Sequence, residues 1–193
     1  MVVKNGCNFG RNQIFMNRKL LNPELNRIDG EGYQNAVKLP VVLVLDNLRS
    51  QHNIGSAFRT SDAFLLESIC LCGITAVPPN KEIHKTALGA EDVVPWKKYN
   101  KTMDAITDLR SQGYTIFSVE QAERSIKLNE FIPDKGSRIA FVFGNEVKGV
   151  EQEVIDASDH CIEVPQSGTK HSLNVSVCIG VVLWDLVTKW KVF

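Results

Sequence analysis

Polar residues that could bind a substrate gather in three segments of the sequence, each at the end of an apolar stretch. They include an arginine, whose fork of five N–H donors suits a phosphate, together with a carboxylate, two amides and a hydroxyl. The candidates are Asn53, Arg59, Glu146, Ser172 and Asn174. No group of His, Cys and Asp has the spacing of a metal-ligand set, so the sequence predicts no metal site.

The first segment runs off an apolar stretch into a predicted helix. Asn53 stands where we expect the N-cap, and Gly55 permits the close approach of another backbone or a ligand. Arg59 follows about one and a half helical turns later. It is either a surface arginine on a capped helix or an arginine that binds a phosphate.

The second segment is a glycine loop. Gly144 and Gly149 are spaced as in a phosphate-binding loop, but Val150 and Glu151 stand where a Walker A motif needs Lys and Ser or Thr. The G-x-G-x-x-G fingerprint of a dinucleotide site is also missing. The pattern argues against a nucleotide triphosphatase. It leaves either a tight loop with Glu146 at its tip or a glutamate in the first turn of a helix.

The third segment follows a strand that ends at Pro165. Gly168 allows a turn, and Ser172 is the expected N-cap of an almost wholly apolar helix. Asn174 needs a polar partner, because a buried amide without one costs about 1–3 kcal/mol. A neighbouring loop, a second subunit or a ligand could each supply that partner.

The elements that must position these segments are those of an α/β domain. β-branched runs typical of buried strands occur at 41–45, 68–72, 114–119, 138–143 and 160–164. Helical patterns occur at 54–66, 101–112, 149–157 and 172–190. This alternation predicts a mainly parallel sheet with helices on both faces. Ligands bind such sheets at the carboxyl ends of the strands, which points to the loops after residues 45, 72, 143 and 164.

Composition fits one such domain. The chain has 193 residues, of which 44% are hydrophobic, and we place a compact α/β domain at 40–193 after a basic extension at 1–39. Its 22 Lys and Arg balance 22 Asp and Glu, so any nucleic-acid site must be local. The extension is either solvated, with a short helix near 31–37, or a contact for a polyanion. Arg49 and the pairs Lys81/Lys85 and Lys97/Lys98 are either solvated surface or a positive track.

The apolar runs, the first residues and the cysteines of the sequence indicate where the protein is located and whether its cysteines are paired. No apolar run reaches the roughly 18 residues of a membrane span, and the first ten residues lack a secretion signal, so we expect a cytoplasmic protein with no membrane partner. The odd number of cysteines and the lack of a C-x-x-C fit neither disulfides nor zinc. We expect Cys70, Cys72, Cys161 and Cys178 to be buried and Cys7 to be exposed.

The three segments, taken in order, resemble the motifs of the SpoU (TrmH) family of RNA 2′-O-ribose methyltransferases, within the SPOUT class. The matching patterns are Asn53-x-Gly55-x-x-x-Arg59-Thr60, Phe143-Gly144-x-Glu146-x-x-Gly149 and Pro165-x-x-Gly168-x-x-x-Ser172-Leu-Asn174-Val-Ser176. The resemblance covers about residues 40–186, and no motif position departs from it.

The resemblance implies an α/β fold whose C-terminal segment is threaded into a deep trefoil knot, although general topology rules disfavour knots. It also implies a homodimer, with the first-motif helix and the last helix near the two-fold axis, and S-adenosylmethionine as the cofactor. The implied neighbours of the cofactor are Gly144, Asn145, Ile162, Pro165, Gln166 and Leu173.

The implied reaction is methylation of a ribose 2′-OH in structured RNA, with tRNA slightly favoured over rRNA. Arg59 would be the main catalytic residue, while Asn53, Glu146, Ser172 and Asn174 would orient it and the ribose. A free guanidinium essentially never deprotonates. A role for Arg59 as the literal base is therefore a hypothesis, which requires it first to pair with the substrate phosphate. Glu146 is expected to hold its partners, not to titrate.

Two other function classes remain open on the sequence. One is a non-catalytic RNA-binding or assembly protein that retains the cofactor-binding fold, against which the intact Arg59, Glu146 and Asn174 count. The other is a nucleotide-binding α/β enzyme, which the missing phosphate fingerprints disfavour.

Overall fold

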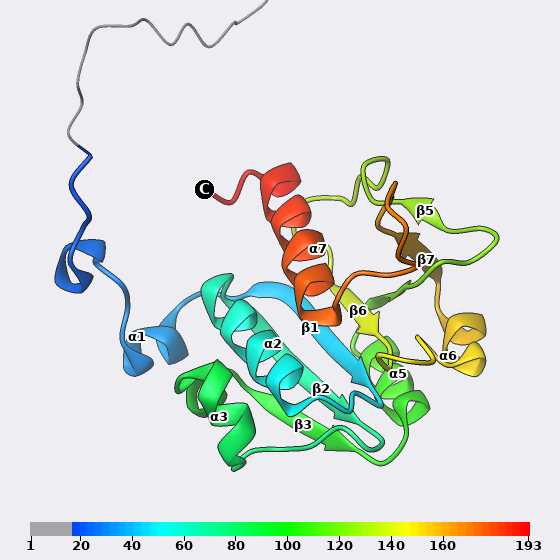
Figure 1. Ribbon diagram of the computed structural model, residues 1–193, viewed down its shortest axis with the longest axis horizontal. Helices are drawn as coiled ribbons and strands as arrows, with labels where there is room; N and C mark the ends of the chain where they lie inside the picture. The colour runs from blue at the N-terminus through cyan, green and yellow to red at the C-terminus, as the bar shows by residue number, and fades with distance from the viewer. Residues whose placement is uncertain (1–16) are drawn as a thin grey trace, which may run out of the picture.

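The computed structural model describes residues 17–193. Its centre is a seven-stranded sheet with the order β3-β2-β1-β6-β4-β7-β5, and each neighbouring pair of strands is parallel (Figure 1). The strands are β1 (Leu39–Asp46), β2 (Leu66–Cys72), β3 (Trp96–Tyr99), β4 (Thr115–Val119), β5 (Ile126–Lys127), β6 (Ile139–Phe143) and β7 (His160–Glu163). The predicted α/β class with a mainly parallel sheet is confirmed.

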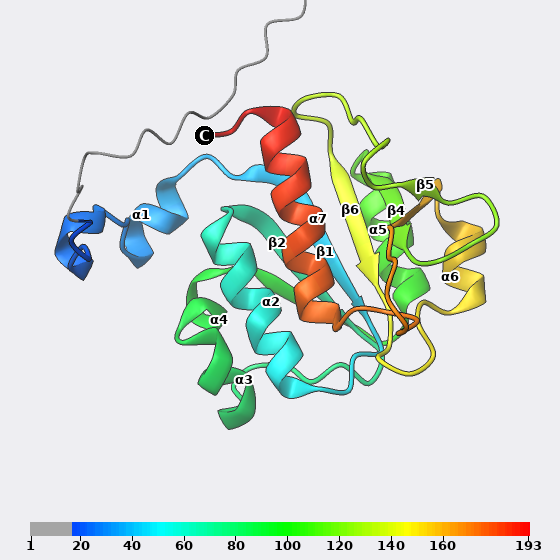
Figure 2. The same ribbon diagram turned by 45° about the horizontal axis from the view of Figure 1, so that its top comes forward.

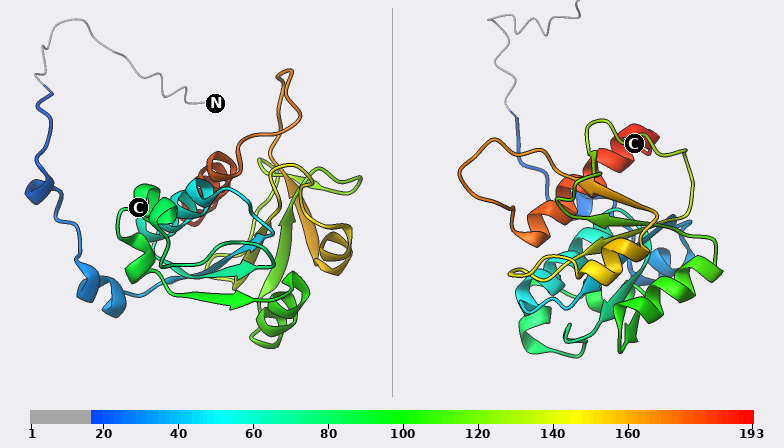
Figure 3. Two further views of the ribbon diagram at one scale, coloured as in Figure 1. Left: turned by 60° about the horizontal axis from the view of Figure 1, so that its bottom comes forward. Right: turned by 90° about the vertical axis from the view of Figure 1, so that its right-hand side faces the viewer.

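Helices flank the sheet on both sides. They are η1 (Asn22–Leu25), α1 (Gly30–Asn35), α2 (Gln51–Ala63), α3 (Lys81–Ala87), α4 (Ala90–Val93), α5 (Thr102–Ser111), α6 (Gln152–Ala157) and α7 (Val175–Trp190). Figure 2 shows α2 and α7 side by side over one face, and Figure 3 shows helices on both sides of the sheet seen edge-on.

Two apolar cores separate the layers. The side chains of β1 alternate between them: Val41, Leu43 and Leu45 face α2, α3 and α7, while Val42 and Val44 face α5 and α6. All five are at most 1% exposed, and burying such a side chain contributes about 1.5–3 kcal/mol. This burial on both faces is what the continuous apolar run of β1 predicts.

The central pairing fixes where the candidate segments begin. Leu45 at the end of β1 lies opposite Phe143 at the end of β6. The first and second motif segments therefore leave the sheet side by side at one edge. The register of β1 against β6 is enough to place the two segments side by side.

Two strands were not predicted from the sequence. β3 carries the mostly exposed residues Trp96–Tyr99 at one edge of the sheet, and β5, at the other edge, is only two residues long. An edge strand buries little surface, so its sequence carries no apolar run to reveal it.

The described end of the N-terminal extension packs against the domain. Tyr33 in α1 is 2% exposed and donates its hydroxyl to Leu66 O at 3.2 Å, while Gln34 Nε2 donates to Val93 O at 2.9 Å. The short helix expected near 31–37 is thus present. Lys4, Cys7 and Arg11 lie outside the described residues.

The cysteine prediction is confirmed for two positions. Cys70 and Cys72 are buried, whereas Cys161 and Cys178 are only partly buried. The expectation was wrong for the latter two because Cys161 lies near the end of the sheet and Cys178 lines a cavity. No helix among residues 17–193 is long and apolar enough to span a bilayer.

Candidate functional site

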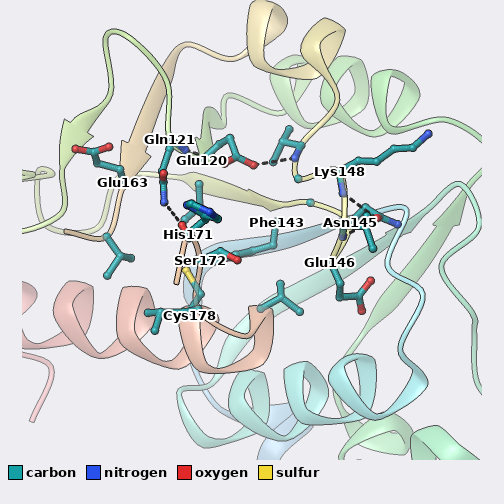
Figure 4. A pocket seen from close by; sticks show the side chains of 18 of the residues that line it. Glu120, Gln121, Phe143, Asn145, Glu146, Lys148, Glu163, His171, Ser172 and Cys178 are labelled. Carbon is teal, nitrogen blue, oxygen red and sulfur yellow. Dashed lines mark hydrogen bonds between the residues drawn. The ribbon is translucent and has the colours of Figure 1, made fainter. Parts of the chain in front are cut away.

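A cavity of about 690 Å³ opens at the carboxyl ends of β4, β6 and β7, beside the first turns of α7 (Figure 4). Of the four loops that the sequence predicted, those after residues 143 and 164 line it, whereas those after residues 45 and 72 do not. The loop that follows β4 also lines it, and this loop was not among those singled out. It could have been found, because the same rule about carboxyl ends applies to the predicted strand 114–119.

The glycine loop between β6 and α6 closes on itself. Asn145 and Gly149 exchange both backbone hydrogen bonds, at 2.8 and 2.9 Å. A Cβ built on Gly144 would lie 2.1 Å from the carbonyl carbon of Gly149, and Gly149 itself has a φ of +71°. Only glycine fits both positions, so the tight loop predicted from the sequence is present.

Glu146 at the tip of this loop reaches across to the start of α2. Its carboxylate accepts hydrogen bonds from Arg49 N at 3.0 Å, Ser50 N at 2.9 Å and Asn53 Nδ2 at 3.0 Å. Glu146 is not in the first turn of a helix, since α6 begins only at Gln152. The carboxylate instead binds the first motif segment to the second.

These hydrogen bonds keep Glu146 ionised. Burial acts to raise its pKa, but the N–H groups of Arg49 and Ser50 and the amide of Asn53 act against burial and leave the pKa lowered. Glu146 therefore holds its partners as an anion at neutral pH.

Asn53 connects the third segment to the same cluster. Its Oδ1 accepts a hydrogen bond from Asn174 Nδ2 at 3.3 Å, while Asn174 Oδ1 accepts from Ser176 N at 2.9 Å. Asn53 is 8% exposed, so its amide is satisfied mainly by these contacts. Glu146, Asn53 and Asn174 thus form a continuous hydrogen-bonded chain through the three motifs.

Both expected N-caps are displaced. α2 begins earlier than predicted, and Ser50 caps it by accepting from Asn53 N at 3.3 Å, which places Asn53 inside the first turn. α7 begins later than predicted, and Asn174 caps it in place of Ser172. Asn174 is exposed, not buried, and its partner is a neighbouring helix. Several Ser and Asn residues near each helix start can serve as caps, so sequence alone does not choose among them.

The residues implied as cofactor neighbours fall into two groups. Gly144, Asn145, Gln166 and Leu173 line the cavity, as does Ser172 from the catalytic set. Two others are not among the lining residues: Ile162 is fully buried in β7, and Pro165 is exposed in the loop that follows.

Arg59 lies apart from this cavity within one chain. It is exposed on α2, its side chain has no hydrogen bond or ion pair with the residues that the structure describes, and it lines a separate hollow of about 450 Å³ with Lys85 and Phe64. The structure therefore brings together four of the five catalytic candidates, with Arg59 about one and a half turns along the same helix as Asn53.

Several cavity residues were not found from the sequence. Glu120 and Gln121 follow β4, His171 precedes the third motif, and Cys178 lies in the second turn of α7. Gln121 Nε2 donates to His171 O at 2.6 Å, which ties the loop after β4 to the third segment. Among residues 17–193, no group of three or more His, Cys, Asp or Glu residues could hold a metal ion.

The lysines considered as a positive track are mostly paired. Lys85 lies 2.7 Å from Glu82, and Lys97 lies 2.7 Å from Asp108. Lys98 donates to the carbonyl of Thr75 at 2.7 Å. These contacts favour the structural interpretation of these three residues.

Comparisons with known proteins agree with this geometry. The chain is 31% identical over 152 residues to a Staphylococcus saprophyticus protein assigned to the TrmH family of tRNA/rRNA methyltransferases, over 79% of this chain and 60% of that protein. It is 29% identical over 150 residues to the 23S rRNA (guanosine-2′-O-)-methyltransferase RlmB of Neisseria meningitidis, over 78% of this chain and 59% of that protein. The chain thus spans about 60% of the length of these curated relatives.

Solved structures share the fold. The SpoU methyltransferase AviRb from Streptomyces viridochromogenes in complex with AdoMet superposes with a TM-score of 0.71 at 19% identity, covering 82% of this chain and 64% of that one. A structure from work on the 2-OH methylation of C/U34 on tRNA superposes with a TM-score of 0.70 at 21% identity, covering 79% of this chain and 97% of that one. The model of the SpoU rRNA Methylase family matches residues 40–184, and the chain belongs to that family.

Proposed function

We propose that this protein transfers a methyl group from S-adenosylmethionine to a ribose 2′-OH in structured RNA. The observation that carries the proposal is the hydrogen-bonded chain of Glu146, Asn53 and Asn174, which joins all three motifs beside the cavity. Family membership and the 2′-O activity named for the RlmB relative support the same reaction.

The chemistry of the cavity lining fits S-adenosylmethionine. Phe143, Val119, Ile155 and Leu173 offer apolar surface for a nucleobase, while a carboxylate among the lining residues suits a sulfonium. Gly144, Asn145, Gln166 and Leu173 would hold the cofactor, with backbone contributed by Ile162 in β7 and by Pro165 in the loop that follows. Bound there, the cofactor supplies an electrophilic methyl group whose departure leaves a neutral thioether.

In this proposal the polar chain positions the ribose hydroxyl, and Arg59 binds the neighbouring phosphate. The hydrogen bonds between Glu146 and Asn53 and between Asn53 and Asn174 hold these side chains in a single orientation toward the substrate. Ser172 lines the cavity and supplies a further hydroxyl. The role of Arg59 as a base remains a hypothesis, because its guanidinium must first pair with the phosphate.

We further propose a homodimer in which Arg59 of one copy serves the cavity of the other. α7 carries an exposed apolar stripe at Val177, Val181 and Trp184, which are 52%, 37% and 59% exposed. The Trp184 ring lies 6.4 Å from that of Phe64 at the end of α2, so the stripe continues toward Arg59. Such a stripe at helical spacing is typical of an interface.

The knot and the division of the chain are part of the same proposal. We place the catalytic domain at residues 40–193 and the extension at 1–39. The chain after β6 crosses β4 to form β7 and returns to pack α7 against α2, and this route is compatible with a trefoil knot built from 144–190. A tRNA substrate is slightly favoured over rRNA, because the tRNA-methylation structure is almost fully covered by this chain. A non-catalytic RNA-binding or assembly protein is the alternative.

A methyl-transfer assay tests the proposal. Purified protein is incubated with labelled S-adenosylmethionine and with undermethylated total tRNA or rRNA, and the label is mapped to the ribose. We expect 2′-O label in one pool, and a loss of at least about 100-fold in the Arg59→Ala variant. Arg124→Ala is the matched control, since Arg124 is exposed and lines neither cavity. Cofactor binding without transfer to either pool would favour the non-catalytic alternative.

A further inference from the structure

The 690 Å³ cavity is lined by three glutamates, one lysine and one histidine: Glu120, Glu146, Glu163, Lys148 and His171. Two of the glutamates are directed elsewhere. Glu146 is held by the start of α2, and Figure 4 shows the Glu163 carboxylate directed away from the other labelled side chains. Glu120 is left as the carboxylate that lies between the loop after β6 and the third segment.

The Glu120 carboxylate is held by two backbone N–H groups, one from the glycine loop and one from the next residue in the chain. Its Oε2 accepts from Val150 N at 3.0 Å, and its Oε1 accepts from Gln121 N at 2.8 Å. A Cβ on Gly149 would lie 2.1 Å from Oε2, so the carboxylate rests directly against the glycine loop. A carboxylate has about four lone-pair sites, of which these contacts use two. The others remain for a ligand in the cavity.

The charge of Glu120 reaches the opposite wall. Cys178 on α7 has its pKa raised to about 11, chiefly by burial and further by the negative charge of Glu120. Glu120 and Cys178 line the same cavity, so the carboxylate and the start of α7 border one space.

We propose that Glu120 is the residue by which this cavity distinguishes the cationic cofactor from its reaction product. The inference rests on the proposed function. S-adenosylmethionine carries one more positive charge than S-adenosylhomocysteine, because methyl transfer converts a sulfonium into a thioether. A fixed carboxylate binds S-adenosylmethionine more tightly than S-adenosylhomocysteine and so favours release of the product.

Calorimetric titration of the full chain tests this assignment. The ligands are S-adenosylmethionine, S-adenosylhomocysteine and sinefungin, which has an amine in place of the sulfonium. In Glu120→Gln, the Kd should rise about tenfold for the two more cationic ligands and less than about twofold for S-adenosylhomocysteine. Glu120→Asp keeps the charge and should retain most of the discrimination.

The matched control is Glu123→Gln, which removes the same charge from an exposed position outside the cavity lining. It should leave all three Kd values unchanged. An equal loss for every ligand in Glu120→Gln, or no loss, would overturn the inference while leaving the proposed function standing. A wild-type protein that binds none of the three would overturn both.

Discussion

At the scale of single residues, glycines determine whether the polar chain can form. Glu146 reaches α2 only because the loop before α6 is tight, and that loop requires Gly144 and Gly149. Gly149 has a left-handed φ of +71° and lies against the Glu120 carboxylate. One glycine thus supports both Glu146 and Glu120.

We expect Gly149→Ala to destabilise the protein by about 2–3 kcal/mol, from left-handed strain and loss of the Glu120–Val150 hydrogen bond. For a chain of this size the Tm should fall by about 5–10 °C in calorimetry. Gly168→Ala is the control, because a Cβ there meets nothing within 4 Å, and its Tm should stay within about 1 °C. Equal stability of the two variants would contradict this account of the loop.

At the scale of elements, α7 has two different faces. Ile179, Val182, Leu183 and Leu186 are fully buried against the sheet, while the stripe at 177, 181 and 184 remains exposed. The sequence predicted an almost wholly apolar helix here. In the proposed dimer, the second copy covers the exposed stripe.

A charge in that stripe should separate the two copies. We expect wild-type protein to elute as a dimer of 21.5 kDa chains and Val181→Glu to elute as a monomer, as measured by light scattering after gel filtration. Val37→Glu places the same charge at a valine that is 93% exposed in the N-terminal segment, and should remain dimeric. A wild-type monomer would refute the dimer.

The helices and strands with strong apolar patterns could be predicted from the sequence, and those with weak ones could not. β1 and β6 are buried on both faces and carry continuous apolar runs, whereas β3 exposes most of its residues. The capping residues were misplaced by two or three positions because adjacent Ser and Asn residues are equally able to cap. Glu120 was missed because the loop after β4 was not singled out, and its carboxylate meets the glycine loop only through the pairing of β4 with β6.

At the scale of the whole molecule, one chain does not assemble every residue that the proposed reaction needs. Glu146, Ser172 and Asn174 line the cavity, and Asn53 is hydrogen-bonded to the first and last of them. Arg59 lies in the separate hollow on α2. A two-fold pairing through α7 and the end of α2 would bury Arg59 in the interface. In the proposed dimer, a second copy of the chain completes the site.

Mixing two inactive variants tests this claim most directly. Arg59→Ala and Glu146→Ala should each lack methyl transfer, but an equal mixture, unfolded and refolded together, should recover about a quarter of wild-type activity. Half of the dimers would then be mixed, and one of the two sites in each would have both residues intact. Tritium transfer to the responsive RNA pool measures the recovery. An inactive mixture whose mixed dimers are confirmed by mass spectrometry would contradict a site shared between copies.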